Sequence, residues 1–145
     1  MEIIVKKFSE LNINELYEIL HVRSKVFVEE QNCAYLDLDN VDQEAYHVYA
    51  RENGKIIAYL RVIDKNKRLE HVSIGRVLSL DRKRGVGSEI MKVGIKVAKE
   101  KFGADIIQIG AQVQAKHFYQ NLGFTEISKE YLEDGIPHVY MIYKI

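Results

Sequence analysis

The spacing of apolar and polar positions along the chain predicts a mixture of helices and strands. Apolar residues recur at three- and four-residue intervals in 12–30, 88–102 and 115–122, which is the period of an amphipathic helix. Runs rich in β-branched and aromatic residues predict strands at 3–8, 46–51, 56–63, 69–80, 106–111, 125–131 and 138–145. We expect an α/β (α+β) fold of order βααβββαβαββ, with helices on both faces of a mixed sheet, in a single domain over residues 1–145.

Local signals refine this pattern. Asn53-Gly54, between two strand-like runs, is typical of a tight hairpin turn. Gly103 follows the helical run 88–102 and predicts its C-terminal cap, and Gly94 on the apolar face of that run favours close packing on the sheet. Arg23 lies within the apolar stripe of the first helix, so we expect it to be a buried or half-buried ion-pair partner.

A basic, glycine-containing turn at residues 82–87 (Arg-Lys-Arg-Gly-Val-Gly) separates a strand-like run from the second helix. Such a turn points backbone N–H groups and the positive end of the helix dipole in one direction, which suits a phosphate group. The turn lacks the Gly-Lys-Ser/Thr ending of a P-loop, and Ile90 occupies the third glycine position of the dinucleotide-binding fingerprint. On these residues alone, a phosphate site and a basic surface turn are both open.

The turn resembles the Arg/Gln-x-x-Gly-x-Gly/Ala signature of the acetyl-CoA-binding N-acetyltransferases of the GNAT superfamily. Residues 111–124 resemble its other hallmark, in which a short helix carries an Ala, a Tyr four residues on and a closing Gly-Phe. Ala115, Tyr119 and Gly123-Phe124 match, and Gln112 stands where Asn is usual. The runs 26–33 and 133–138 are similar to the ElaA-like subgroup, so the resemblance covers nearly the whole chain.

This resemblance implies a GNAT-type, mostly antiparallel sheet and direct transfer of an acetyl group from acetyl-CoA to an amine of a small molecule or peptide. The pantetheine would pair with the strand before the turn, in a slot between splayed strands, and backbone N–H groups of the turn would hold the pyrophosphate. Tyr119 would act as the general acid for the CoA thiolate; the alternative is that it only packs its helix on the sheet. The implied cofactor-binding residues are Val77, Leu78, Ser79, Arg82, Lys83, Arg84, Gly85, Val86, Gly87, Ser88, Gln112 and Phe118.

A protonated amine must lose a proton before it attacks, which costs about 4–5 kcal/mol for a lysine-like amine at pH 7. The sequence does not choose among the candidate general bases, which are His71, Ser73, Glu29, Glu30 and His138. A covalent intermediate on Cys33 is disfavoured because no histidine has an evident pairing with it, and direct transfer is the norm of the family.

Composition narrows the classes of function. The 145 residues are 47% apolar with one proline, which argues against disorder, and 21 basic residues against 21 acidic ones argue against a nucleic-acid partner. The chain has no apolar run of membrane-spanning length, no signal-peptide pattern and a single cysteine, so we expect a cytoplasmic protein without a membrane partner. The spacing of the five histidines predicts no metal site.

The charge is unevenly distributed. Residues 26–50 contain six acids and no Lys or Arg, whereas residues 51–101 contain 14 Lys or Arg against six acids. One hypothesis is that the basic middle meets the polyanionic cofactor and the acidic stretch attracts a cationic amine; the other is solvated surface charge. Rival functions are a non-catalytic acyl-CoA-binding sensor acting through a protein partner and a nucleotide-binding domain, which the missing motifs disfavour. A homodimer is possible through exposed strand edges.

Overall fold

The computed structural model of the chain describes residues 1–82 and 84–145; Lys83, one of the expected cofactor-binding residues, lies outside the described residues. The strands are β1 (Glu2–Lys7), β2 (Tyr46–Glu52), β3 (Lys55–Ile63), β4 (Val72–Ser79), β5 (Ile106–Gln112), β6 (Thr125–Glu126), β7 (Tyr131–Glu133) and β8 (Ile136–Lys144). The α-helices are α1 (Ile13–Arg23), α2 (Val86–Phe102) and α3 (Lys116–Asn121). A π-helical segment covers Ser24–Glu30, and single 3-10 turns cover Phe8–Glu10, Asp42–Glu44 and Val113–Ala115.

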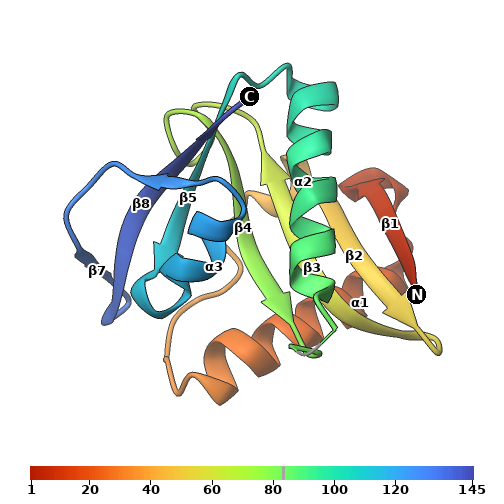
Figure 1. Cartoon of the computed structure of the whole chain (residues 1–145). Helices are drawn as coiled ribbons and strands as arrows, with labels where there is room; N and C mark the ends of the chain where they lie inside the picture. Colours follow the sequence, from red (N-terminus) through yellow and green to blue (C-terminus); the bar gives the residue numbers. More distant parts are fainter. Residues whose placement is uncertain (83) are drawn as a thin grey trace.

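The described strands form one eight-stranded sheet in the order β1-β2-β3-β4-β5-β8-β6, with β7 paired to β8. The β4–β5 pair is parallel, and the other neighbours are antiparallel. Helices α2 and α3 lie on one face of the sheet and α1 lies on the other (Figure 1). The predicted mixed, mostly antiparallel sheet with helices on both faces is therefore confirmed.

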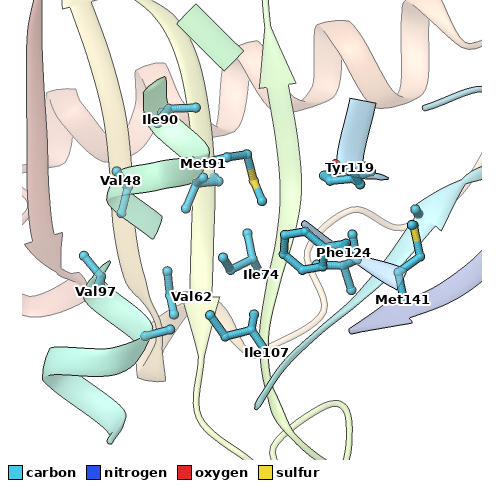
Figure 2. Packing of buried hydrophobic residues seen from close by; sticks show 14 of the residues in the cluster. Val48, Val62, Ile74, Ile90, Met91, Val97, Ile107, Tyr119, Phe124 and Met141 are labelled. Carbon is cyan, nitrogen blue, oxygen red and sulfur yellow. The ribbon is translucent and has the colours of Figure 1, made fainter. Parts of the chain in front are cut away.

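Alternation along the central strands builds a core on each face of the sheet. Val48 and Leu60 belong to the larger core, with Met91 of α2, whereas Tyr49 and Tyr59 belong to the smaller core against α1. Both faces of these strands are buried, which explains their nearly continuous apolar runs. Figure 2 shows the larger core continuing from α2 across the sheet to Tyr119, Phe124 and Met141.

The helix ends follow from capping residues. Asn12 and Glu15 form a reciprocal capping box at the start of α1. Helix α2 begins at Val86, earlier than expected, because Gly85 takes the N-cap in a left-handed conformation at φ 69°. It ends at the predicted cap, Gly103. Gly94 of α2 packs closely on the sheet, since a Cβ there would lie 3.1 Å from both Leu60 methyl carbons.

Two expected elements differ from the structure. The helix expected over 12–30 is α-helical only to Arg23 and continues as the π-helical segment Ser24–Glu30. The strand expected over 125–131 is wrong, because this region holds only β6 and the first residue of β7. Pairing with β8 stops after the Tyr140 carbonyl accepts from the Ile127 N–H, since the Ser128 hydroxyl then accepts from the Tyr140 N–H in place of a backbone carbonyl.

Candidate active site

A cavity of about 1140 Å³ lies where β4 and β5 cease to pair. The two strands pair in parallel only at Val72 with Ile107 and at Ser73 with Gln108. Further along, residues 74–79 of β4 line the cavity, together with Ile109, Gly110 and Gln112 of β5. Helices α2 and α3 line it from one face of the sheet, and the π-helical segment and the β7–β8 hairpin line it as well. The cavity therefore passes between the strands.

A bulge in β4 interrupts its regular pairing with β3 beside the cavity. Tyr59 of β3 pairs with Leu78 and Arg61 pairs with Gly75, so β4 uses one more residue than β3 over this stretch. Arg76 lies in the bulge with φ 53°, a left-handed conformation that non-glycine residues seldom adopt. The bulge bends the strand just before Val77, Leu78 and Ser79, the three residues expected to face pantetheine, and all three line the cavity.

The start of α2 lines the cavity beyond the end of β4. The first four N–H groups of an α-helix have no acceptor within the helix, and at α2 the residues that carry them are 85–88. Gly85, Gly87 and Ser88 line the cavity, as does Arg82. The side chain of Val86 is buried in the larger core instead. This end of the cavity thus has donors and positive partial charge suited to an anion.

Arg84 departs from the expectation for a cofactor-binding residue. Its guanidinium donates to both carboxylate oxygens of Glu52 and to Asp81, and its backbone N–H donates to Asp81 Oδ1 at 3.3 Å. It does not line the cavity. The reason is local: the carboxylates of Asp81 and Glu52 bind the guanidinium, so Arg84 stabilises the turn instead of facing the cavity.

Tyr119 lies on α3 at the edge of the larger core and lines the cavity. Its side chain packs edge-on against Phe118 and Phe124, and the residue is only 8% exposed. Within the described part of the chain its hydroxyl has no hydrogen-bond partner, and burial raises the pKa of the phenol above its ordinary value of 10.0. Tyr119 therefore stays protonated at neutral pH, and its O–H group is available as a hydrogen-bond donor.

Gln112 and Phe118 take different positions around the same cavity. Gln112 ends β5 and donates from Nε2 to Gln31 Oε1 at 3.2 Å, while Gln114 donates to its Oε1 at 2.9 Å. Phe118 lies over the start of α2, and a Cβ built at Gly87 would be 3.5 Å from its Cζ. Gln112 thus links the end of β5 to Gln31, the residue that follows the π-helical segment, and Phe118 narrows the cavity beside the start of α2.

The structure separates the five candidate bases. Glu30 and His138 line the cavity, whereas His71, Ser73 and Glu29 do not. Cys33 lines the cavity too, but its thiol donates to the Asp134 carbonyl at 3.3 Å, and no histidine of the described chain forms a hydrogen bond with it. A nucleophilic role for Cys33 gains no support from this geometry.

Three acids of the stretch 26–50 form ion pairs within the protein, whereas one hypothesis was that this stretch attracts a cationic amine. Asp37, Asp39 and Asp42 bind the guanidinium groups of Arg23, Arg61 and Arg76. Burial opposes ionisation of Asp39 and Asp42, but these arginines outweigh it and hold the pKa of both carboxyls below their usual range. The expected ion-pair role of Arg23 is confirmed, and these three acids are neutralised rather than free to attract an amine.

The sequence did not single out the contribution of the β7–β8 hairpin. Glu133, Asp134 and Ile136 line the cavity beside His138, and Arg68 approaches from the loop before β4. Residues 133–138 stood out through the resemblance and His138 only as one of five candidate bases, and the side of the sheet on which the hairpin packs depends on pairing between residues distant in the chain. Gly110, an isolated glycine in an apolar strand, was the one available signal of a close approach.

Among residues 1–82 and 84–145, no group of His, Cys, Asp and Glu side chains is arranged to hold a metal ion. No helix in that part of the chain is long and apolar enough to cross a membrane.

Known proteins are similar to this chain in sequence and in fold. Residues 8–145 match the acetyltransferase (GNAT) domain. Protein ElaA of Escherichia coli is 37% identical over 137 residues, which cover 92% of this chain and 90% of ElaA. The crystal structure of Escherichia coli ElaA superposes with a TM-score of 0.91 at 34% identity, covering 99% of both chains.

Two further structures extend the likeness. An acyl-CoA N-acyltransferase from Pseudomonas aeruginosa has a TM-score of 0.91 at 33% identity, with 99% of both chains covered. An aminoglycoside 6'-N-acetyltransferase solved in complex with coenzyme A shares the fold, with a TM-score of 0.73 at 14% identity over 97% of this chain and 96% of the other. The family match over nearly the whole chain, on a cavity of this construction, places the chain in the GNAT acetyltransferase family.

Proposed function

We propose that this chain is an acetyl-CoA-dependent N-acetyltransferase that transfers the acetyl group directly to an amine of a small molecule or peptide. One observation carries the proposal: a single cavity between β4 and β5 is lined both by the donor-rich start of α2 and by Tyr119. An anionic, thiol-bearing cofactor needs an anion site and a hydrogen-bond donor for its sulfur within one channel. Coenzyme A bound to a protein of the same fold supports this assignment.

The cofactor would lie along β4. The pyrophosphate would accept from the N–H groups of Gly85, Gly87 and Ser88, with Arg82 nearby, and the pantetheine would follow residues 77–79. The missing β4–β5 pairing leaves room for a chain of amides to take the place of a neighbouring strand. Holding the thioester and the amine in one cleft raises their effective concentration, which accounts for much of the catalysis.

Tyr119 would stabilise the leaving group, the CoA thiolate. Expulsion of CoA creates a thiolate, and the protonated phenol donates a hydrogen bond to it. An ordinary phenol and thiol differ by about 1.5 units in pKa, so full proton transfer is already mildly uphill. Burial raises the pKa of Tyr119 further, so its main contribution is stabilisation of the thiolate by hydrogen bonding.

A turnover assay tests the proposal. CoA release is followed with cadaverine, phenethylamine, glucosamine, Nα-acetyllysine and trialanine as acceptors. We expect turnover with at least one amine, and a fall in kcat of about 100-fold in Tyr119→Phe with the KM for acetyl-CoA little changed. Tyr17→Phe is the matched control because Tyr17 is exposed and outside the cavity. Acetyl-CoA binding without turnover on any amine would instead favour the non-catalytic acyl-CoA sensor.

A further inference from the structure

The β7–β8 hairpin brings an imidazole and a carboxylate to the cavity wall away from the cofactor. Resting on the proposed function, we infer that His138 is the base that takes the proton from the acceptor ammonium and that Glu133 is the carboxylate that seats this ammonium. His138 Nε2 lies 3.5 Å from Glu133 Oε2, and both residues line the cavity. An ammonium placed between them can donate to both groups.

The hydrogen bonding of His138 defines which nitrogen is available. Nδ1 lies 2.7 Å from the carbonyl oxygen of Ile136. A carbonyl only accepts, so Nδ1 carries the hydrogen in this contact, and the neutral imidazole has its lone pair on Nε2. The acceptor nitrogen of the ring therefore points to Glu133 and the cavity, as a general base requires.

Neighbouring groups hold the ring in place. His138 is 7% exposed, and its ring stacks on Tyr131, with centroids 5.8 Å apart and planes at 29°. Tyr131 in turn stacks on Tyr140 at 4.5 Å. Arg68 Nη2 lies 3.5 Å from Glu133 Oε1, on the carboxylate oxygen that does not face the histidine. One oxygen of Glu133 is thus anchored and the other faces Nε2.

His138 also lies opposite the leaving-group side of the cavity. It pairs with Gln112, the last residue of β5, and Tyr119 follows on α3. Its neighbour Val139 belongs to the core that contains Tyr119, so alternation along β8 turns His138 to the other face of the sheet. An amine entering from the hairpin side can add to one face of the thioester carbonyl, while Tyr119 lies on the other face of the sheet, where it can reach the leaving sulfur.

Glu30 is the other candidate base that lines the cavity, but burial and basicity both favour His138. Glu30 is exposed, so water competes for its carboxylate, whereas His138 is buried. An imidazole also has a basicity suited to neutral pH, while an ordinary carboxylate is a weaker base. Glu30 is better placed to meet the outer part of a cationic acceptor.

The proposed step balances in atoms and charge. One ammonium proton passes to His138 Nε2, and the imidazolium is stabilised by Glu133. The freed nitrogen lone pair forms the C–N bond to the acetyl carbonyl carbon, and the C–S bond breaks with its electron pair going to the CoA sulfur. The second nitrogen proton reaches the thiolate, which Tyr119 stabilises, and the histidine releases its proton to water. The products are the amide, CoA thiol and one proton.

Several titratable or charged groups surround His138 and share in any pH response. Glu133 and Tyr131 lie on β7, Asp134 lies in the turn, and Arg68 lies on the loop before β4. Glu30, Cys33 and Asp39 face the same cavity from the segment after α1. A change in the pH profile must therefore be assigned by substitution rather than by the value at which it occurs.

His138→Asn tests the inference, because the Asn amide can still donate to the Ile136 carbonyl while the accepting Nε2 is lost. The probes are the best primary alkylamine of the panel above and hydroxylamine, which is largely neutral at pH 7 and needs no base to free its lone pair. His71→Asn is the control, since His71 lies outside the cavity. Calorimetric titration with acetyl-CoA verifies that each variant keeps a folded cofactor site.

We expect His138→Asn to lower kcat/KM for the alkylamine about 100-fold at pH 7 and to leave the rate with hydroxylamine within about threefold of wild type. Its kcat/KM should climb about tenfold per pH unit towards the pKa of the amine, whereas the wild type levels off earlier. Equal loss with both nucleophiles, or an unchanged profile, overturns the assignment of His138 while the acetyltransferase proposal stands. Acetyl-CoA binding with no turnover in the wild-type chain overturns both.

Discussion

Asp37 joins helix α1 to the bulge of β4, because its two carboxylate oxygens accept from different arginines. Arg23 Nε donates to Oδ2 at 3.0 Å, and Arg76 Nε donates to Oδ1 at 2.8 Å. Arg76 is the bulge residue with φ 53°, so the ion pair holds a backbone conformation that is otherwise unfavourable. Residues 77–79 of β4, which are expected to meet pantetheine, are therefore held in place by contacts with the α1 side of the sheet, opposite α2 and α3.

Asp37→Ala should lower the free energy of unfolding by about 3 kcal/mol, because Arg23 is fully buried and loses one of its two carboxylate partners. Urea unfolding measures this change. Glu44→Ala is the control: its pair with Lys67 is exposed, and we expect less than about 1 kcal/mol. Equal losses in the two variants would contradict the role given to the buried pair.

Acid should destabilise the protein through Glu15. Burial of this carboxyl favours its protonated form, but hydrogen bonds from the Asn12 N–H, Lys6 and Tyr49 outweigh burial and lower its pKa to about 2. Because the folded pKa lies below the ordinary value of 4.5, the ionised group stabilises the fold above about pH 4.5 and this contribution fades as the pH falls towards 2. The difference in unfolding free energy between wild type and Glu15→Gln should therefore shrink on acidification from pH 6 to pH 3.

The matched control for acid sensitivity is Glu2→Gln, at an exposed position of β1. Its difference from wild type should be small at both pH values. A gap for Glu15→Gln that stays constant between pH 6 and pH 3 would show that its hydrogen bonds do not favour the ionised carboxylate.

Gly87→Ala should separate stability from cofactor affinity. An added Cβ would lie 3.5 Å from Phe118 Cζ and 3.8 Å from Ser79 Cβ, which are ordinary contacts, and alanine raises helix stability by up to about 1 kcal/mol. The same methyl group narrows the approach to the N–H groups at the start of α2, so affinity for acetyl-CoA should fall at least about tenfold. Thermal unfolding and calorimetry measure the two effects.

Gly85→Ala provides the contrast, because Gly85 has φ 69° and its Cβ would meet no neighbour within 4 Å. Here the cost is backbone strain of about 1–2 kcal/mol in stability. If Gly87→Ala left the acetyl-CoA affinity unchanged, the start of α2 would not be the phosphate site.

The sequence predicted the elements whose signals are local. Period and capping residues located α2 up to Gly103, and the Asn53-Gly54 turn marked the hairpin between β2 and β3. The π-helical segment Ser24–Glu30 was missed because its apolar spacing fits an α-helix equally well. The exit of the chain from the sheet at Ser128 depends on a side-chain acceptor for Tyr140, which no periodicity reports.

The candidate site was predictable where a motif carried it. Most of the cofactor-binding residues expected from the turn motif and the Tyr119 motif line one cavity in the structure. Arg84 does not, because its guanidinium binds Asp81 and Glu52. The partners of Asp37 and the packing of the hairpin around His138 were not predictable, since both depend on contacts between residues far apart in the chain.

The most direct measurement is calorimetric titration of the wild-type chain with acetyl-CoA, with ATP and NAD as matched phosphate-bearing controls. The account predicts saturable binding of one acetyl-CoA per chain, weakened by Gly87→Ala, and no comparable binding of ATP or NAD. Absence of acetyl-CoA binding, or equal binding of ATP, would contradict the claim that the cavity between β4 and β5 is an acetyl-CoA site.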